Sequence, residues 1–326
     1  MTNVETEAST FMRPSDRIIH KAAWLYYAHG LRQDEVARAL SISRASVAMY
    51  LRRARETGIV TISTSTQLFA EDVLARRLED AFGLDAVWVV PSGRSPDDPN
   101  ADVPVVAASV FTSLVEAGTR IGVAWGRTVY TIADLMSHAD LQGVTVVQLC
   151  GNLGAPYSYR PDQCTMEIAR RLNAQGLNFY APLVLSSEAL ASALRDEPVI
   201  RDQMEGISTC DLALFSPGTV DAGSHIVACG AVQPSELEAL RAAGAAGVVA
   251  GRVIDASGKG LDCDYNRRLI SADLDSIRAI PKRLVVAQEP SKLEPLMAVI
   301  AGGLCSHLVL GAELAGQLLE TATGDR

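Results

Sequence analysis

From residue 86 to the C-terminus, short runs rich in aliphatic and β-branched residues alternate with longer stretches of helical character. This alternation constrains the fold more than any other feature, because it indicates a mainly parallel sheet with helices on both faces, a doubly wound α/β architecture. The predicted strands are 86–90, 121–124, 144–149, 211–215, 247–250, 283–287 and 307–310. The predicted helices are 103–117, 128–138, 163–175, 187–204, 234–243, 291–301 and 311–320. Ligands of such sheets bind at the carboxyl ends of the strands, so the loops there are the candidate site.

The first 65 residues have a different pattern, that of a small helical domain. Residues 1–14 are polar and patternless, which predicts a disordered tail. Beyond the tail, helical spacing, caps and a β-branched run predict three helices and a short strand, at 16–29, 33–40, 44–56 and 59–63. Three short helices with a tight turn before the third, followed by a strand, describe a winged or simple helix-turn-helix.

The third predicted helix has the features of a DNA recognition helix. Its inward face is apolar, whereas small residues and arginines point outward, which permits close approach to the major groove. The alternative interpretation is a solvated basic face with no nucleic-acid partner. The residues predicted to contact DNA are Gln33, Ser43, Arg44, Ala45, Ser46, Arg52 and Arg53. Of these, Arg44, Ala45 and Ser46 are the candidates for base contacts, because the N-terminal part of a recognition helix lies deepest in the groove.

The charge distribution favours a polyanionic partner for the N-terminal part alone. The chain of 326 residues has a net charge of −9. Residues 1–65 hold nine basic and six acidic residues, a net charge of +3, so the remainder carries −12. Such an asymmetry is expected when only the first part meets double-stranded DNA.

The sequence argues against a membrane protein, a secreted protein and a metal-binding protein. No apolar run approaches the roughly 18 residues that indicate a membrane span. The N-terminus lacks the order of a secretory signal, so we expect a cytoplasmic protein with no membrane partner. The six cysteines and five histidines do not have the spacing of a metal site, and we expect reduced thiols, no metal and no cofactor.

Several stretches closely resemble the SorC family of sugar-binding transcriptional regulators. They are Ala23–Ala37, Leu40–Arg44, Ala54–Val60, Gly122–Thr128, Gly247–Asp255, Pro281–Lys292 and Gly302–Gly303. The resemblance covers residues 15–320, and the order and spacing of the stretches make it specific. It implies a winged helix-turn-helix, an effector domain related to phosphosugar isomerases, a tetramer, and DNA release or rearrangement when a sugar or phosphosugar binds. We therefore expect a DNA-binding domain over 15–65, a linker helix over 66–82 and a sugar-binding effector domain over 83–326.

Three loops after predicted strands are candidates for the effector pocket: 122–128, 150–154 and 288–292. The first lies where a strand gives way to a helix, a place where backbone amides attract polar oxygens and glycine allows a close approach. By resemblance, Asp255 and Lys292 occupy pocket positions of the family, and Gln163 lies beside the second loop. The candidate effector-binding residues are Gly122, Trp125, Gly126, Arg127, Thr128, Gly151, Asn152, Gln163, Asp255, Gln288, Glu289 and Lys292.

The charge of the effector is left open by two of these loops. The family commonly has paired glycines where this chain has Gly151-Asn152 and Gln288-Glu289. A carboxylate at Glu289 repels a phosphate unless Arg127 or Lys292 offsets it. A neutral sugar, polyol or sugar lactone is therefore an alternative to a phosphosugar.

The sequence predicts a regulator that is not an enzyme, and two other functions are alternatives. A phosphosugar isomerase with an attached DNA-binding domain could use Asp255 and Glu289 for acid–base chemistry. No P-loop, GxSxG or GxGxxG motif is present, however, and such an enzyme has no need of residues 16–63. The second alternative is an interaction module whose N-terminal helices bind protein; its binding would depend on salt far less steeply than DNA binding does.

Overall fold

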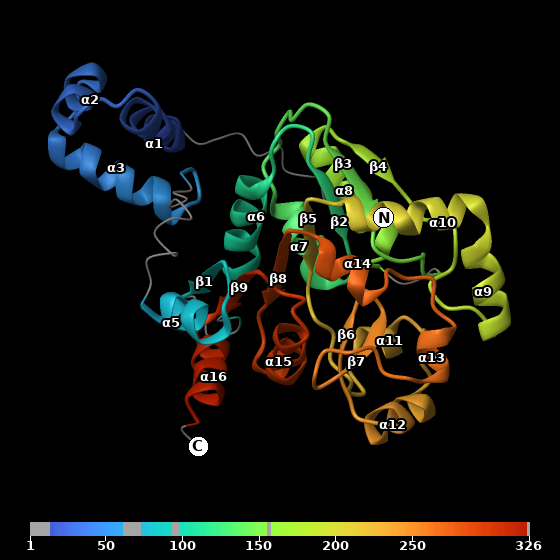
Figure 1. The fold of residues 1–326 in the computed structure, drawn as a ribbon. Helices are drawn as coiled ribbons and strands as arrows, with labels where there is room; N and C mark the ends of the chain where they lie inside the picture. Colours follow the sequence, from blue (N-terminus) through green and yellow to red (C-terminus); the bar gives the residue numbers. More distant parts are fainter. Residues whose placement is uncertain (1–13, 61–72, 93–97, 99, 155–157, 325–326) are drawn as a thin grey trace, which may run out of the picture. The chain divides into compact units, whose positions relative to one another are not determined.

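The computed structural model describes residues 14–60, 73–92, 98, 100–154 and 158–324. The chain divides into two compact units, Met1–Ser65 and Thr66–Arg326, which are described separately below (Figure 1). No helix in the described ranges is both long and apolar enough to cross a membrane.

The N-terminal unit contains the three predicted helices. They are α1 (Pro14–Ala23), extended by a π-helical turn over Trp24–Ala28, then α2 (Gln33–Leu40) and α3 (Arg44–Glu56). The turn between α2 and α3 is tight because Ser41 adopts a left-handed conformation with a φ of 55°. Ser43 then caps α3, since its Oγ accepts a hydrogen bond from the backbone N–H of Ser46 at 3.0 Å. The bounds of α2 and α3 coincide with the prediction.

The helices of this unit enclose a small apolar core. Its fully or nearly fully buried side chains come from all three helices and are Ile19, Ala22, Ala23, Val36, Ala37, Val47, Leu51 and Ala54. Burial of Val47, Leu51 and Ala54 leaves the opposite face of α3 in solvent. Of the strand predicted at 59–63, Ile59 and Val60 form a bend, and 61–63 lie outside the described residues, as do residues 1–13 of the predicted tail.

The second unit is built on a seven-stranded sheet in which every pairing is parallel, so the predicted fold class is confirmed. In spatial order the strands are β1 (Ala86–Val90), β9 (His307–Gly311), β8 (Lys282–Ala287), β5 (Leu212–Phe215), β2 (Arg120–Val123), β3 (Thr145–Gln148) and β4 (Gln175–Leu177). The strands β1, β5, β8 and β9 are largely apolar, without regular alternation of polar residues, because both faces of the sheet are covered.

Helices cover the two faces of the sheet. The helices of the unit are α5 (Val73–Phe82), α6 (Val103–Leu114), α7 (Arg127–Leu135), α8 (Pro161–Leu172), α9 (Glu188–Asp196), α10 (Pro198–Glu205), α11 (His225–Ala228), α12 (Pro234–Ala242), α13 (Asp264–Arg267), α14 (Leu274–Ala279), α15 (Leu293–Ala301) and α16 (Ala312–Thr323). One core cluster joins the sheet to α5, α14, α15 and α16, and the other joins it to α6, α7 and α8. The part of the predicted linker helix that is described, α5, packs against β1 and α16 of this unit (Figure 1).

Two local predictions were wrong, and one strand was missed. The strand predicted at 247–250 is β6 (Ala245–Val249), which does not join the main sheet but pairs antiparallel with β7 (Arg252–Asp255). The chain reverses between them because Ala250 and Gly251 both have positive φ, the geometry of a tight hairpin turn. The helix predicted at 187–204 is two helices, because Pro198 starts a new one. The edge strand β4 was not predicted at all.

The connections of the central strands create a natural place for a ligand. β2 and β5 are neighbours, with Ile121 paired to Leu212 and Val123 to Leu214. After β2 the chain passes through α7 to β3, on one side of this pair, whereas after β5 it goes on to β8 on the other side. The connections therefore diverge at the carboxyl ends of β2 and β5, and such a switch point leaves a crevice there.

Candidate functional site

A cavity of about 310 Å³ lies at this switch point. Its walls come from the loops after β2, β5 and β8, from the start of α11 and from the β6–β7 turn. The lining residues are Ala124, Trp125, Gly126, Arg127, Thr128, Ser216, Pro217, Gly218, Thr219, Asp221, Gly223, His225, Ile226, Val248, Ala250, Gly251, Glu289, Ser291 and Lys292.

The loop after β2 ends at a glycine that the geometry requires. Gly126 precedes α7 with a φ of 114° and a ψ of 172°, a region that residues with a Cβ rarely enter. A Cβ at this position would also lie 3.2 Å from Nδ1 of His225. The first hydrogen bond of the helix runs from Tyr130 N to Gly126 O, so the amides of Arg127 and Thr128 have no partner within α7. The helix thus begins at the cavity with polar donors available to a ligand.

Four charged side chains line the cavity and nearly balance one another. Arg127 Nη2 donates to Glu289 Oε1 at 2.9 Å, in a pair whose side chains are 60% and 34% exposed and which therefore lies at the solvent side. Lys292 is largely enclosed, and its Nζ donates to the backbone oxygen of Pro217 at 2.5 Å. Asp221 Oδ1 accepts from the backbone N–H of Gly223 at 2.8 Å.

Burial changes the titration of two of the lining groups. Burial lowers the pKa of Lys292; Arg127 lowers it further, whereas Glu289 and Asp221 raise it. Burial likewise lowers the pKa of His225 below 6.5, and Lys292 and Arg127 add to the effect. The shift favours the neutral form of His225, and by residue type the cavity holds two basic side chains, Arg127 and Lys292, and two acidic ones, Glu289 and Asp221.

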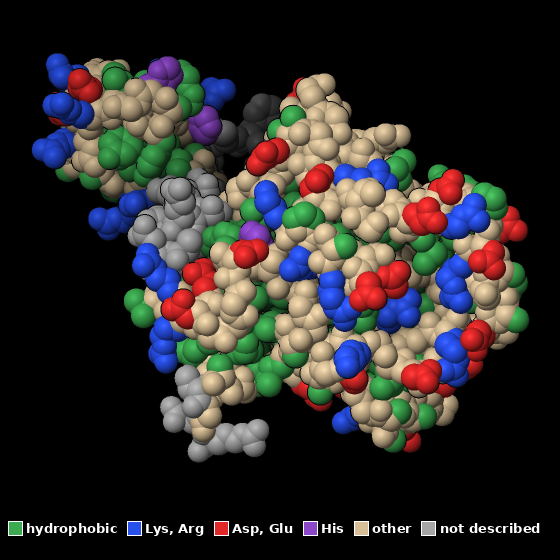
Figure 2. Space-filling model, in the orientation of Figure 1, with side chains coloured by type: hydrophobic (Ala, Val, Ile, Leu, Met, Phe, Trp, Pro, Cys, Tyr) green, Lys and Arg blue, Asp and Glu red, His purple; other side chains and the backbone are tan. Residues whose placement is uncertain are grey.

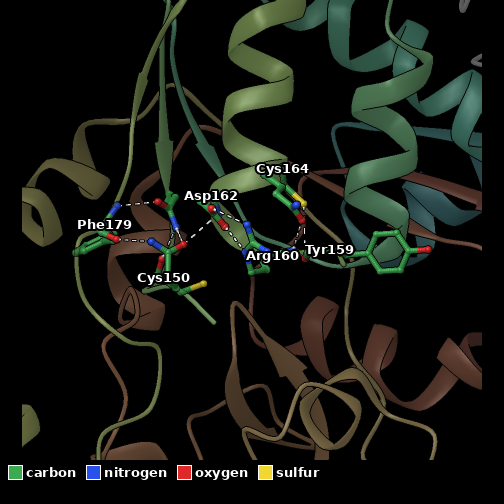
Figure 3. A network of polar contacts seen from close by, with 9 residues as sticks. Cys150, Tyr159, Arg160, Asp162, Cys164 and Phe179 are labelled. Carbon is green, nitrogen blue, oxygen red and sulfur yellow. Dashed lines mark hydrogen bonds and ion pairs between the residues drawn. The ribbon is translucent and has the colours of Figure 1, made fainter. Parts of the chain in front are cut away.

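The structure brings six of the twelve predicted effector residues to this cavity: Trp125, Gly126, Arg127, Thr128, Glu289 and Lys292. The loop after β3 does not line the cavity, and its polar groups are hydrogen-bonded to neighbouring segments (Figure 3). Asn152 Nδ2 donates to Phe179 O at 2.6 Å, and its Oδ1 accepts from Gln148 Nε2 at 2.9 Å. Gly151 is packed so closely that a Cβ would lie 2.6 Å from Pro182 O.

The remaining predicted residues also have local roles outside the cavity. Gln163 Oε1 accepts from Arg160 N at 3.3 Å at the start of α8. A Cβ on Gly122 would lie 2.7 Å from Cδ2 of Leu149, so this glycine serves packing in β2. Asp255 Oδ1 accepts from Ser257 N at 2.8 Å and Lys259 N at 3.1 Å, which stabilises the turn after β7. Gln288 follows β8 but does not line the cavity.

Sequence reasoning missed the loop after β5 and the histidine behind it. Ser216, Asp221 and His225 all line the cavity. The signal was present, because the run Ser216–Thr219 of serine, proline, glycine and threonine follows directly after a predicted strand. In the described residues, no group of three or more His, Cys, Asp or Glu side chains is placed to hold a metal ion.

The predicted DNA-contacting residues of α3 form an accessible face. Arg44, Ala45, Arg52 and Arg53 are exposed, and Ser46 and Gln33 are half-buried. Among the described side chains, no ion pair occupies Arg44, Arg52 or Arg53. Figure 2 shows several Lys and Arg side chains on the visible face of this unit. The arrangement leaves a cationic helix face with small side chains, suited to a groove of DNA.

Comparison with known proteins identifies the family to which this chain belongs. Residues 67–320 match the family model Sugar-bind, described as "Putative sugar-binding domain". The fold also resembles that of the full-length sorbitol operon regulator SorC from Klebsiella pneumoniae, with a TM-score of 0.70 and 25% identity over 93% of this chain and 98% of that one. The chain belongs to the SorC family. The resemblance seen in the sequence is thereby confirmed.

Relatives of this SorC-family protein match it almost from end to end. The uncharacterized transcriptional regulator YjhU of Escherichia coli strain K12 is 29% identical over 325 residues, 98% of each chain. The deoxyribonucleoside regulator of Bacillus subtilis strain 168 is 27% identical over 310 residues, 94% of this chain and 98% of the relative. Both matches span the helix-turn-helix unit as well as the sheet unit, so the chain is a transcriptional regulator with a sugar-binding domain.

Proposed function

We propose that this SorC-family regulator binds operator DNA through α3 and that a sugar, polyol or phosphosugar in the cavity controls the affinity for DNA. The observation that carries the proposal is the cavity at the β2–β5 switch point, lined by polar groups from three loops, within the residues that match the sugar-binding family. Its volume of about 310 Å³ lies at the lower end of the range for small-molecule sites, roughly 300–1,000 Å³.

On the DNA side, Arg44, Ala45 and Ser46 contact bases, and Gln33, Ser43, Arg52 and Arg53 lie against the phosphate backbone. The exposure of the arginines and the absence of ion pairs with other described side chains support this assignment. Ser43 also caps the N-terminus of α3, so it orients this helix in addition to any contact with DNA. Contacts to base edges carry sequence preference, whereas phosphate contacts position the protein.

Control of DNA binding requires more than one DNA-binding unit. A single helix-turn-helix holds one half-site weakly, so we propose a homo-oligomer, a tetramer as the family resemblance implies, acting on DNA in the cytoplasm with no membrane partner. The effector alters DNA affinity only by binding one arrangement of the units better than another. A tenfold change in operator affinity needs about 1.4 kcal/mol of such preference.

We further propose that the cavity binds its ligand without turnover. Asp255, one of the two carboxylates considered for acid–base chemistry, accepts hydrogen bonds in a turn outside the cavity. The other, Glu289, is paired with Arg127. Only one of the two carboxylates therefore lies at the cavity, so the pair considered for acid–base chemistry is not assembled there.

DNA binding is tested with a fluorescent fragment of the promoter of this protein's own gene. Wild-type affinity should fall with salt with a log–log slope of about −0.9 per phosphate contacted. Arg44→Ala should reduce the preference for the promoter over random DNA at least fivefold, since a lost base contact costs about 1–3 kcal/mol, and leave effector binding unchanged. Arg17→Ala, an exposed arginine on α1, is the matched control. Binding that is insensitive to salt would refute the DNA assignment, and loss of effector binding in Arg44→Ala would mean that the roles of the two units are wrong.

A further inference from the structure

Glu289 has hydrogen-bonding capacity that the described residues leave unused. Its Oε1 accepts from Arg127 at 2.9 Å. Its Oε2 is buried and has no hydrogen-bond partner in the described part of the chain. A carboxylate offers about four acceptor sites, and leaving a buried one unpaired is unfavourable. Glu289 lines the cavity, so it has acceptor capacity there for further hydrogen-bond donors.

A second unpaired polar group lies directly after the neighbouring strand, β5. Ser216 lines the cavity, and its Oγ is buried without a hydrogen-bond partner among the described residues. Ser216 follows β5 and Glu289 follows β8, and these strands are paired through Phe215 and Val285. A hydroxyl group both donates and accepts, so it can satisfy the carboxylate as well as the serine.

The charge of the cavity decides which hydroxyl-bearing ligands fit. The two basic side chains, Arg127 and Lys292, are matched in number by the two acidic ones, Glu289 and Asp221, and burial favours the neutral form of His225. A phosphate group would find no surplus of positive charge here. It would also compete with Glu289 for Arg127 or lie beside the Glu289 carboxylate, and like charges within a few ångströms of each other repel. An uncharged ligand meets neither obstacle.

Building on the proposed function, we propose that Glu289 determines the effector's charge: an uncharged polyhydroxylated compound, a sugar or a polyol, donates hydroxyl hydrogens to this carboxylate, and phosphorylated sugars are excluded. Glu289 acts as acceptor and as a charge filter, and Ser216 binds a neighbouring hydroxyl. Arg127 stays paired with Glu289 and orients it.

The test uses the full-length protein and matched pairs of compounds that differ only in a terminal phosphate. The panel contains the common sugars and polyols of three to six carbons, including ribose, xylitol and glucitol, each with its phosphate ester. Thermal melting identifies binders, and calorimetric titration gives the dissociation constants. In the wild type, the uncharged member of a pair should bind at least tenfold more tightly than its phosphate. Glu289→Gln, which keeps the shape and removes the charge, should reduce this preference at least tenfold.

Two further variants separate the causes. Glu294→Gln, an exposed glutamate at the start of α15 that does not line the cavity, should leave affinity and preference unchanged. Ser216→Ala should reduce the affinity for the uncharged ligand severalfold and leave the preference for uncharged over phosphorylated compounds unchanged. Tighter binding of phosphates by the wild type, or an unchanged preference in a folded Glu289→Gln protein, overturns the inference and leaves the proposed function standing. If no compound of either kind binds folded wild-type protein, the cavity is not an effector site and both fail.

Discussion

Replacing Gly126 by alanine tests whether the start of α7 shapes both the fold and the cavity. At a φ of 114° and a ψ of 172°, a residue with a Cβ carries backbone strain of about 1–3 kcal/mol. The new methyl group would also lie 3.2 Å from the His225 ring, so the ring or the loop has to move by a few tenths of an ångström. We therefore expect the second unit to lose about 1–3 kcal/mol of unfolding free energy. Because the first amides of α7 move with residue 126, ligand affinity should fall by about tenfold, which corresponds to about 1.4 kcal/mol.

The assay is urea unfolding followed by tryptophan fluorescence. In a Trp24→Phe background the remaining tryptophans, Trp88 and Trp125, both report on the second unit. Gly154→Ala is the matched control, because its Cβ meets nothing within 4 Å and its φ is ordinary; it should change stability by less than about 0.5 kcal/mol. The reasoning is refuted if the two alanine variants unfold at the same urea concentration, or if Gly126→Ala binds the ligand as the wild type does.

Two more predictions concern stability. Gly316→Ala, in the middle of α16 with open space around its Cβ, should raise the free energy of unfolding by about 0.4–1 kcal/mol, and a urea midpoint no higher than that of the wild type would contradict this. Hydrogen bonds from Arg170, and then from Arg171, lower the pKa of Glu167 to about 2 from its ordinary 4.5, so the stabilisation is complete above pH 4.5 and disappears as the pH falls towards 2. The stability difference between wild type and Glu167→Gln, measured by denaturant unfolding at several pH values, should shrink over that range; a difference independent of pH would be evidence against the ion pairs.

The central strands and the DNA-binding helices could be predicted because their signals are local. The bounds of α2 and α3 follow from caps and apolar spacing, and Ser43 does cap α3. The strands of the sheet interior are short, mostly apolar runs. β4, by contrast, is three residues of an edge strand, Gln175–Leu177, with little to bury and no pattern to detect. The strand at 247–250 has the composition of a sheet strand, and only the turn at Ala250 and Gly251 removes it from the main sheet.

The candidate site was half predictable for a similar reason. The rule that ligands meet the carboxyl ends of parallel strands finds the loops after β2 and β8, and it would have found Ser216 after β5 had it been applied there. The same rule points to the loop after β3, which does not line this cavity, because Cys150 and Asn152 form bridges to Ser271 and Pro182, contacts between distant segments that a single sequence does not reveal. Asp255 looks like a free carboxylate in the sequence, but local backbone amides occupy it.

The position of the cavity has a consequence for engineering. The strands that carry its three loops are buried on both faces, whereas the side chains that line the cavity stand beyond the strand ends, where they support little of the core. Exchanging Ser216, Asp221 or Glu289 should therefore retune what the protein senses at little cost in foldability. A biosensor for a new carbohydrate could be selected from a library confined to these loops, with the N-terminal helices kept as an unchanged reporter.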